Sequence, residues 1–432
     1  MKKNRVWLFA ILFALLQCLA IPELLNAQTP GNAKPIPPEF FGMSTHWFQP
    51  WPVIEFAGLR LWSTQTKWSD LNPGVGVYDW TTLDSFLNAA KQHGETDTLM
   101  TLAMTPQWAS SKPNDTTCDF GPGQCDAPDD LNADGSGTDQ HWKDYVAAVA
   151  THVDGQIKYW EIWNEPAMPY FWNGTFAQLT RMAKDARAVI LAIEPQSKFL
   201  SPPNGADDDW VLKWWAQYAQ AGGLQYADIA AVHGGPHAEY CGDVPHASDF
   251  ITVVQNLRNV LAAYKQSKPI WDTESNWGDA VLECFKDQDM QAAFLAQWYM
   301  FHASLDIPRF YWFAYDDGTV GQLWNPATGK LDEGGVAYGY VRDWMLGATM
   351  TKNCSTSGNS IWTCNFSGPD GYVAQAIWDT AEKCSAGTCE TLTRTVNSTY
   401  TQYRTLAGET INITNHQAPI GAKPIFMENH TR

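Results

Sequence analysis

The sequence predicts an α/β protein with a (β/α)8 TIM barrel followed by a small C-terminal antiparallel β-sandwich domain. Its 432 residues exceed the ~250 of a typical barrel by enough for a second domain. Short β-rich runs alternate with helical patterns over most of the chain. Two of these runs end in polar residues that a strand interior disfavours, which predicts that they lie at the carboxyl mouth of a barrel.

The amino terminus has the pattern of a signal peptide. Lys and Arg at residues 2–5 precede an apolar run over residues 6–20, and Leu25, Asn26 and Ala27 then precede Gln28. The apolar run is short for a membrane span, so we expect cleavage after Ala27 and a secreted or periplasmic protein. The expected divisions are residues 1–27 (signal peptide), 28–348 (barrel) and 349–432 (accessory β-sandwich).

The barrel units follow one another along the chain. In a helix expected at residues 81–93, Leu83, Phe86 and Leu87 share one face, and Gly94 ends it. The expected strands are residues 40–47, 58–63, 96–110 (a strand and its loop), 157–166, 198–204, 227–237, 269–278 and 309–318. The other expected helices are residues 139–151, 176–193 and 334–347.

The first two strands carry candidate site residues. The first ends in His46 and Trp47, which would face the mouth. The second holds Arg60 among apolar neighbours, and an Arg is rarely buried unless it is paired. We expect Arg60 to pair with an acid inside the barrel or, alternatively, to form an ion pair on its outside.

The third strand leads into a long loop. Its Trp108 either lines a binding subsite or anchors the loop, because a ring with apolar faces and one polar edge suits both uses. Residues 110–138 are rich in Asp, Gly, Pro and Asn and hold two cysteines. This composition predicts an ordered loop over the mouth.

Part of this loop resembles the start of a calcium-binding EF-hand loop. Asp130, Asn132, Asp134 and Gly135 match the pattern, but its twelfth position is His141 instead of Glu. Asx-turns explain the same composition without calcium. We therefore expect no metal site.

The run at residues 157–166, IKYWEIWNEP, is the most informative stretch. Asn164, Glu165 and Pro166 end a β-rich run and would lie where the strand stops. Glu165 is therefore a candidate catalytic carboxyl. The alternative is a Glu that caps the following helix, which Pro166 could open.

A second carboxyl follows the seventh expected strand. Residues 269–278 repeat the pattern with Glu274, about three βα units after Glu165 at roughly 30 or more residues per unit. Two acids that flank a glycosidic bond are what glycoside hydrolysis requires. His233 ends the strand between them, either against the reacting groups or as a core histidine bonded to backbone.

The pairing of WNEP with a later strand-end Glu resembles the clan A retaining glycoside hydrolases, and the flanking segments are most similar to family 39 and its relatives. The resemblance covers roughly residues 38–350. It implies that Glu165 is the general acid/base and Glu274 the nucleophile.

The same resemblance implies substrate-binding roles. Arg60 would hydrogen-bond Glu274 and lower its pKa, and Asn164 would hydrogen-bond the sugar 2-hydroxyl. His233 would contact the nucleophile or the substrate. An aromatic floor under the reacting sugar would come from the eighth strand, with Trp312 as first choice and Tyr315 as second.

Charge and composition narrow the partners. A formal net charge of −18 argues against nucleic acid and against strongly acidic polysaccharides, which the field of the protein would repel. Twenty-two Trp residues suit sugar faces as well as cores. We expect a neutral oligo- or polysaccharide as substrate, with no cofactor and no nucleic-acid partner.

The cysteines predict disulfides. Nine cysteines less Cys18 of the signal peptide leave eight, an even number in an exported chain. Short loops predict three bridges, and one pair remains. The expected pairs are Cys118–Cys125, Cys354–Cys364, Cys384–Cys389 and Cys241–Cys284.

The resulting hypothesis is a secreted retaining glycoside hydrolase that uses two Glu side chains and no cofactor. Retention predicts carboxyl groups about 5 to 5.5 Å apart. A transglycosylase on the same scaffold is one alternative. A non-catalytic glycan-binding barrel is another, because a fold alone does not give a function.

Overall fold

The computed structural model describes residues 34–235, 246–278, 285–358, 360–385 and 387–432. The expected signal peptide and the expected Cys241–Cys284 bridge lie outside these residues. Within them, no helix has both the length and the apolar character that a membrane span needs.

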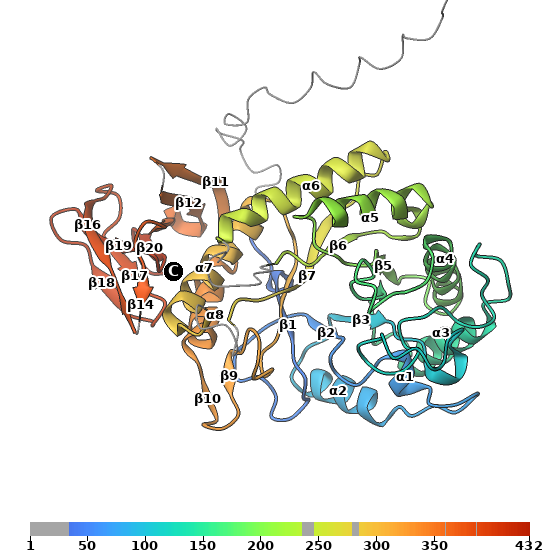
Figure 1. The fold of residues 1–432 in the computed structure, drawn as a ribbon. Coiled ribbons are helices and arrows are strands. Elements are labelled where there is room, and N and C mark those ends of the chain that lie inside the picture. The colour runs from blue at the N-terminus through green and yellow to red at the C-terminus, as the bar shows by residue number, and fades with distance from the viewer. Residues whose placement is uncertain (1–33, 236–245, 279–284, 359, 386) are drawn as a thin grey trace, which may run out of the picture.

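Eight parallel strands form the predicted barrel (Figure 1). Each strand pairs with its neighbours in sequence, and β1 pairs with β8. A bridge between Leu200 and Ile229 joins β5 to β6 and closes the sheet. The strands are β1 (Phe41–Ser44), β2 (Leu59–Leu61), β3 (Thr98–Leu102), β4 (Tyr159–Ile162), β5 (Lys198–Leu200), β6 (Ala230–Val232), β7 (Ile270–Ser275) and β8 (Phe310–Trp312).

Helices surround this sheet, and most bury an apolar side. In α2, Leu83, Phe86 and Leu87 are buried, as the helical spacing predicts. Thr175 and Gln178 form a capping box that begins α4. The helices are α1 (Trp68–Leu71), α2 (Thr81–Gln92), α3 (Gln140–Val153), α4 (Phe176–Ile193), α5 (Asp209–Gln220), α6 (Phe250–Ala263), α7 (Gln288–Ser304) and α8 (Glu333–Met345), with short 3-10 turns at Pro38–Phe40, Gln107–Ala109, Gly223–Tyr226, Ala247–Asp249 and Pro369–Gly371.

The barrel interior is apolar at one level and polar at another. Leu99, Leu200, Ala231, Trp271 and Tyr311 form a buried cluster contributed by five strands. Further toward the carboxyl ends of β3 and β4, the buried side chains are polar, beginning with Thr101 and Glu161. The interior therefore changes from apolar to polar side chains toward the mouth, where other barrels carry their active sites.

Antiparallel strands follow the barrel, as predicted. Six of them form one sheet in the order β11-β12-β13-β20-β17-β18, and two short pairs lie beside it. The strands are β11 (Thr349–Ser357), β12 (Ile361–Ser367), β13 (Val373–Asp379), β14 (Cys384–Ser385), β15 (Thr388–Cys389), β16 (Thr391–Thr395), β17 (Gln402–Arg404), β18 (Thr410–Asn412), β19 (Gln417–Gly421) and β20 (Ile425–Glu428); the hairpin β9 (Trp324–Asn325) and β10 (Lys330–Leu331) precedes α8.

Helix α7 joins the two parts of the molecule. It lies with α8 between the barrel and the C-terminal strands (Figure 1). Its Phe301 ring packs edge-on against Trp362 at 5.0 Å and Trp378 at 5.8 Å between ring centroids. Because α7 faces packed structure on both sides, nearly all of its residues are buried and its sequence shows no polar face.

Three of the predicted disulfides are present among the described residues. Cys118–Cys125 closes a loop beside the barrel mouth, and Cys354–Cys364 and Cys384–Cys389 link strands of the C-terminal sheets. Such bridges fit an exported protein. The domain limits at residues 28–348 and 349–432 remain predictions, although only residues 346–348 separate α8 from β11.

Candidate active site

The first candidate acid, Glu165, follows β4 on a strained turn. Trp163 and Glu165 have φ angles of 62° and 43°, in the left-handed region that non-glycine residues rarely adopt. Each such residue costs on the order of 1–3 kcal/mol and persists only where the surroundings hold it. The turn ends the strand and leaves the Glu165 side chain partly exposed, at 19%.

The second candidate acid, Glu274, lies in β7 at a β-bulge. Asp272 pairs with Phe310 of β8, but Ser275 pairs with Trp312, so three steps along β7 match two along β8. An extra residue of this kind re-aims a neighbouring side chain and is common beside active sites. The Glu274 side chain is 18% exposed at the mouth.

Arg60 lies inside the barrel and pairs with two carboxylates. Its Nη1 donates to Glu274 Oε2 at 2.6 Å, and its Nη2 donates to Glu161 Oε2 at 2.6 Å. Arg60 Nε also donates to Glu161 Oε2, and Nη2 donates to Asn164 Oδ1 at 2.9 Å. Arg60 and Glu161 have no exposed surface, so this buried cation is fully paired, and the alternative of an ion pair on the outside of the barrel is wrong.

His233 connects the two candidate acids. Its Nδ1 lies 2.8 Å from Glu165 Oε1, and its Nε2 lies 4.0 Å from Glu274 Oε2. Burial lowers the pKa of His233, but the charges of Glu274 and Glu165 outweigh burial and raise that pKa above its usual value. The two carboxyl groups thus act to stabilise a proton on the imidazole that lies between them.

The pKa of Glu274 corrects one expectation. Burial raises the pKa of Glu274 above the usual carboxyl value, although the charges of His233 and Arg60 act to lower it. Arg60 therefore makes the predicted contact without producing the predicted net shift. Its charge offsets only part of the cost of burying the carboxylate.

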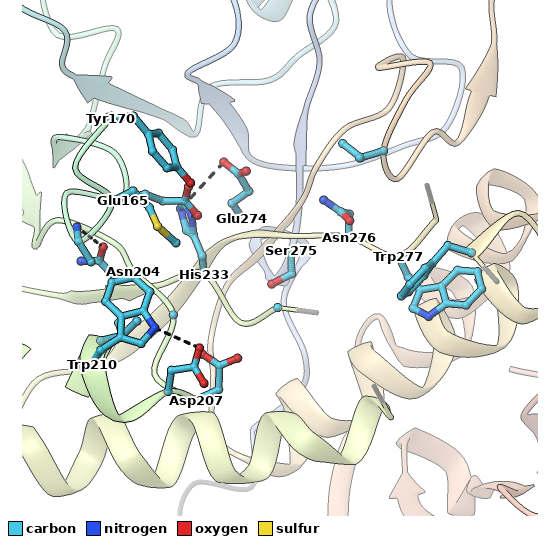
Figure 2. A pocket seen from close by; sticks show the side chains of 18 of the residues that line it. Glu165, Tyr170, Asn204, Asp207, Trp210, His233, Glu274, Ser275, Asn276 and Trp277 are labelled. Carbon is cyan, nitrogen blue, oxygen red and sulfur yellow. Dashed lines mark hydrogen bonds and ion pairs between the residues drawn. The ribbon is translucent and has the colours of Figure 1, made fainter. Parts of the chain in front are cut away.

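A cavity of about 590 Å³ opens in front of these groups. Figure 2 shows Glu165, Glu274 and His233 pointing toward one another, with Tyr170 beside Glu165 and Trp210 on the wall below. Tyr170 and Trp210 are 42% and 46% exposed, so their rings are available to a ligand. Rings of this kind stack on the apolar faces of sugars.

Sequence reasoning missed several members of this site. Glu161 lies inside the run at residues 157–166, but only its burial against Arg60 distinguishes it from an ordinary strand residue. Tyr170 lies in a loop after β4, for which the sequence offers no periodic signal, and Trp210 lies in the first turn of α5, a helix that the sequence analysis did not predict. The one available signal was that a buried Arg60 needs a carboxylate partner.

Of the seven expected binding residues, only His233 is among the described residues that line the cavity; the other six are Arg60, Asn164, His46, Trp108, Trp312 and Tyr315. Trp312 is fully buried and its ring N–H donates to Gly321 O, and Tyr315 is 1% exposed with its hydroxyl accepting from Val53 N. Their contact with a sugar remains a prediction. Trp108 donates to Asn72 O at 2.8 Å, which favours its loop-anchoring alternative.

His46 lies at the mouth, as the end of the first strand predicts. Its Nε2 is 3.2 Å from Asp317 Oδ2, and its backbone N–H donates to Asp316 Oδ1 at 2.7 Å. Burial lowers the pKa of His46, but Asp316, Asp317 and Glu274 raise it by more. Its binding role remains a prediction.

The segment that resembles an EF-hand start is an Asx-turn. Asp134 Oδ1 accepts from Ser136 N at 2.9 Å, and Asp130 Oδ2 accepts from Thr138 Oγ1 at 2.7 Å. The carbonyl of Gly135 accepts from Arg181 Nη1. Internal hydrogen bonds thus use groups that a calcium ion would need.

Sequence comparison gives a partial match. Residues 62–177 match the model "Glycosyl hydrolase family 10", a stretch that contains β4 and Glu165. No curated protein matches the chain.

Solved structures match over nearly the whole chain. A family 39 glycoside hydrolase from Bacteroides cellulosilyticus WH2 is 16% identical with a TM-score of 0.62, covering 86% of this chain and 75% of that one. A family 39 β-xylosidase from Caulobacter crescentus is 17% identical with a TM-score of 0.62, covering 92% and 98%. A family 30 subfamily 8 xylanase from Clostridium acetobutylicum is 14% identical with a TM-score of 0.56, covering 92% and 97%.

The predicted resemblance to the clan A glycoside hydrolases is confirmed. The comparisons name different families within the clan: the sequence model is of family 10, and the similar structures are of families 39 and 30. At identities below 20%, the structural matches establish a shared fold alone. The chemistry must therefore be argued from the site.

Proposed function

We propose that the chain is a retaining glycoside hydrolase that cleaves a neutral glycan by double displacement. The observation that carries the proposal is the linked set Arg60, Glu274, His233 and Glu165 at one cavity. It joins two carboxyl groups through charged partners at a place that a substrate can enter. Clan A enzymes use two such groups in this way.

In the first step, Glu274 attacks the anomeric carbon and forms an ester, while the bond to the leaving oxygen breaks. Glu165 gives its proton to that oxygen. Arg60 and His233 place positive charge beside Glu274 and favour the ionised nucleophile, against the cost of its burial.

In the second step, Glu165 removes a proton from water, and the water oxygen attacks the anomeric carbon. The ester bond breaks and Glu274 leaves as a carboxylate, so the product keeps its configuration. This double displacement requires the two carboxyl groups to lie about 5 to 5.5 Å apart, whereas an inverting reaction needs a separation of about 6.5 to 9.5 Å.

A β-xyloside is the first substrate to test, because structurally similar proteins include a β-xylosidase and a xylanase. Purified protein would be assayed on a panel of 4-nitrophenyl glycosides and on xylan. We expect hydrolysis of at least one glycoside and its loss in Glu165→Gln and Glu274→Gln, with unchanged melting temperatures. Binding without turnover would support the non-catalytic barrel, and transfer to added sugar in preference to water would support a transglycosylase.

A further inference from the structure

Behind the nucleophile lies a buried carboxylate that has no part in the two chemical steps. Asp272 of β7 has no exposed surface and is two residues before Glu274. A buried carboxylate is costly unless its lone pairs are satisfied. Its partners therefore indicate what it is for.

Three elements meet at the Asp272 carboxylate. Ser275 Oγ donates to it at 2.7 and 2.9 Å within β7, and Gly234 N donates at 3.2 Å from the segment after β6. His302 Nε2 contacts it at 2.9 Å from α7. Gly234 N also donates to Ser275 Oγ at 3.0 Å, which closes a small network.

The network includes the direct neighbours in sequence of Glu274 and of His233, the histidine that contacts both acids. Ser275 follows Glu274, and Gly234 follows His233. A one-residue bulge in β7 lies between Asp272 and Ser275, and their side-chain contact spans it. Asp272 therefore fixes the bulge that aims Glu274 and the turn that aims His233.

Packing around the network leaves it little freedom. A Cβ added to Gly234 would lie 2.7 Å from Asp272 Oδ2 and 2.6 Å from the Phe250 ring. The His302 ring stacks on Phe250 with centroids 4.1 Å apart and donates from Nδ1 toward Trp298 O at 2.8 Å. Only glycine fits at residue 234, and the histidine is held at both ring nitrogens.

We infer that Asp272 is a positioning residue for the nucleophile, acting with Ser275 and His302 to hold the β7 bulge and the His233 turn in the reactive arrangement. The inference rests on the proposed role of Glu274. A misplacement of about 1 Å can cost roughly 100-fold in rate even when the reacting groups are intact.

The test is the rate at which Glu274 forms a covalent adduct. The probe is 2,4-dinitrophenyl 2-deoxy-2-fluoro-β-xyloside, whose leaving group needs no proton, with the labelled residue identified by mass spectrometry. We expect Asp272→Asn to slow labelling by about 10- to 100-fold. The KM for a 4-nitrophenyl β-xyloside should change much less than kcat, because the wall residues that hold the sugar are intact.

Two further variants separate positioning from stability. Ser275→Ala keeps the Asp272–His302 contact and removes only the hydroxyl at the bulge, so it decides the question if Asp272→Asn does not fold. Glu428→Gln is the control, because Glu428 is equally buried and accepts hydrogen bonds from Tyr372 and Gln402, but lies in the C-terminal sheet. Its labelling rate should equal that of the wild type.

Wild-type labelling rates in both Asp272→Asn and Ser275→Ala, together with lowered melting temperatures, would show that the network only supports the fold and would overturn the inference. Label on a residue other than Glu274 in the wild type would instead overturn the proposed function, and the inference with it.

Discussion

Arg60 is the residue on which most of the site's electrostatics depend. Its guanidinium bonds Glu274, Glu161 and Asn164 at once, a geometry that a planar fork of donors can satisfy and an ammonium cannot. Glu161 has no exposed surface, so loss of Arg60 would leave a buried charge without its cation.

Arg60→Gln, which removes the cation, should therefore reduce kcat by at least about 100-fold and destabilise the fold by about 3–5 kcal/mol. Activity assays and urea unfolding measure the two effects. Arg187→Gln is the matched control, because Arg187 makes a bidentate pair with Asp228 that is about a quarter exposed and worth about 1 kcal/mol or less. Equal losses in both variants would contradict the role given to Arg60.

The two acids should fail differently when removed. With Glu165→Ala, an aryl glycoside with a good leaving group still forms the glycosyl-enzyme, and azide traps it as a product of retained configuration. With Glu274→Ala, azide enters the space of the carboxylate and attacks directly, which inverts. NMR of the glycosyl azides distinguishes the anomers, and the reverse pattern would mean that the two roles are exchanged.

His233 should make stability depend on pH. Its pKa is raised in the folded protein, so the folded state holds the proton more tightly than the unfolded chain. This contribution is complete below the unfolded value near 6.5 and is lost as the pH rises through the higher folded value. The free energy of unfolding of the wild type minus that of His233→Asn should therefore fall as the pH is raised above 6.5; a difference that grows would contradict the shift.

At the scale of elements, the sequence predicted the site residues at the ends of strands. It missed those whose role depends on contacts with other elements. Asn164, Glu165 and Glu274 stand out because a strand interior would not accept them, and that argument needs only local chemistry. Asp272 and Glu161 look like ordinary strand residues until the partners from other elements are known. The positions of Tyr170 and Trp210 depend on where the loop after β4 and the first turn of α5 lie relative to the mouth.

The first turn of α5 and the turn after β4 should determine how long a substrate the site prefers. Trp210 and Tyr170 offer exposed rings beside the carboxyl pair, where a second sugar unit would stack. Trp210→Ala should raise KM for xylo-oligosaccharides several-fold and change KM for a 4-nitrophenyl xyloside little. The control is Trp47→Ala, since Trp47 is 55% exposed and is not among the described residues that line the cavity. If Trp210→Ala left the KM for xylo-oligosaccharides unchanged from the wild type, the second sugar would bind elsewhere.

At the scale of the whole molecule, the barrel and the C-terminal strands share one hydrophobic core. Buried residues of α7 and α8 belong to the same cluster as Trp362, Phe366 and Trp378 of the sheet. Without the sheet, the apolar outer side of α7 would face water, and exposed apolar patches of that kind favour aggregation.

Removal of residues 349–432 should therefore yield a barrel that is insoluble or unfolded. A milder form of the test is Trp362→Ala, which should cost about 3–5 kcal/mol, because the ring is 8% exposed and packs on Phe301. Soluble fraction on expression and calorimetry measure the outcome. A soluble, active truncation with the melting temperature of the full chain would contradict the shared core.

Phe301 and His302 are consecutive residues of α7, yet one packs against the C-terminal sheet and the other contacts Asp272, two residues before Glu274 in β7. Two consecutive residues of α7 thus link the C-terminal sheet to β7, the strand that carries Glu274. The C-terminal sheet thus supports β7 through α7. Heating should therefore abolish turnover at the temperature at which the sheet melts, in a single cooperative transition.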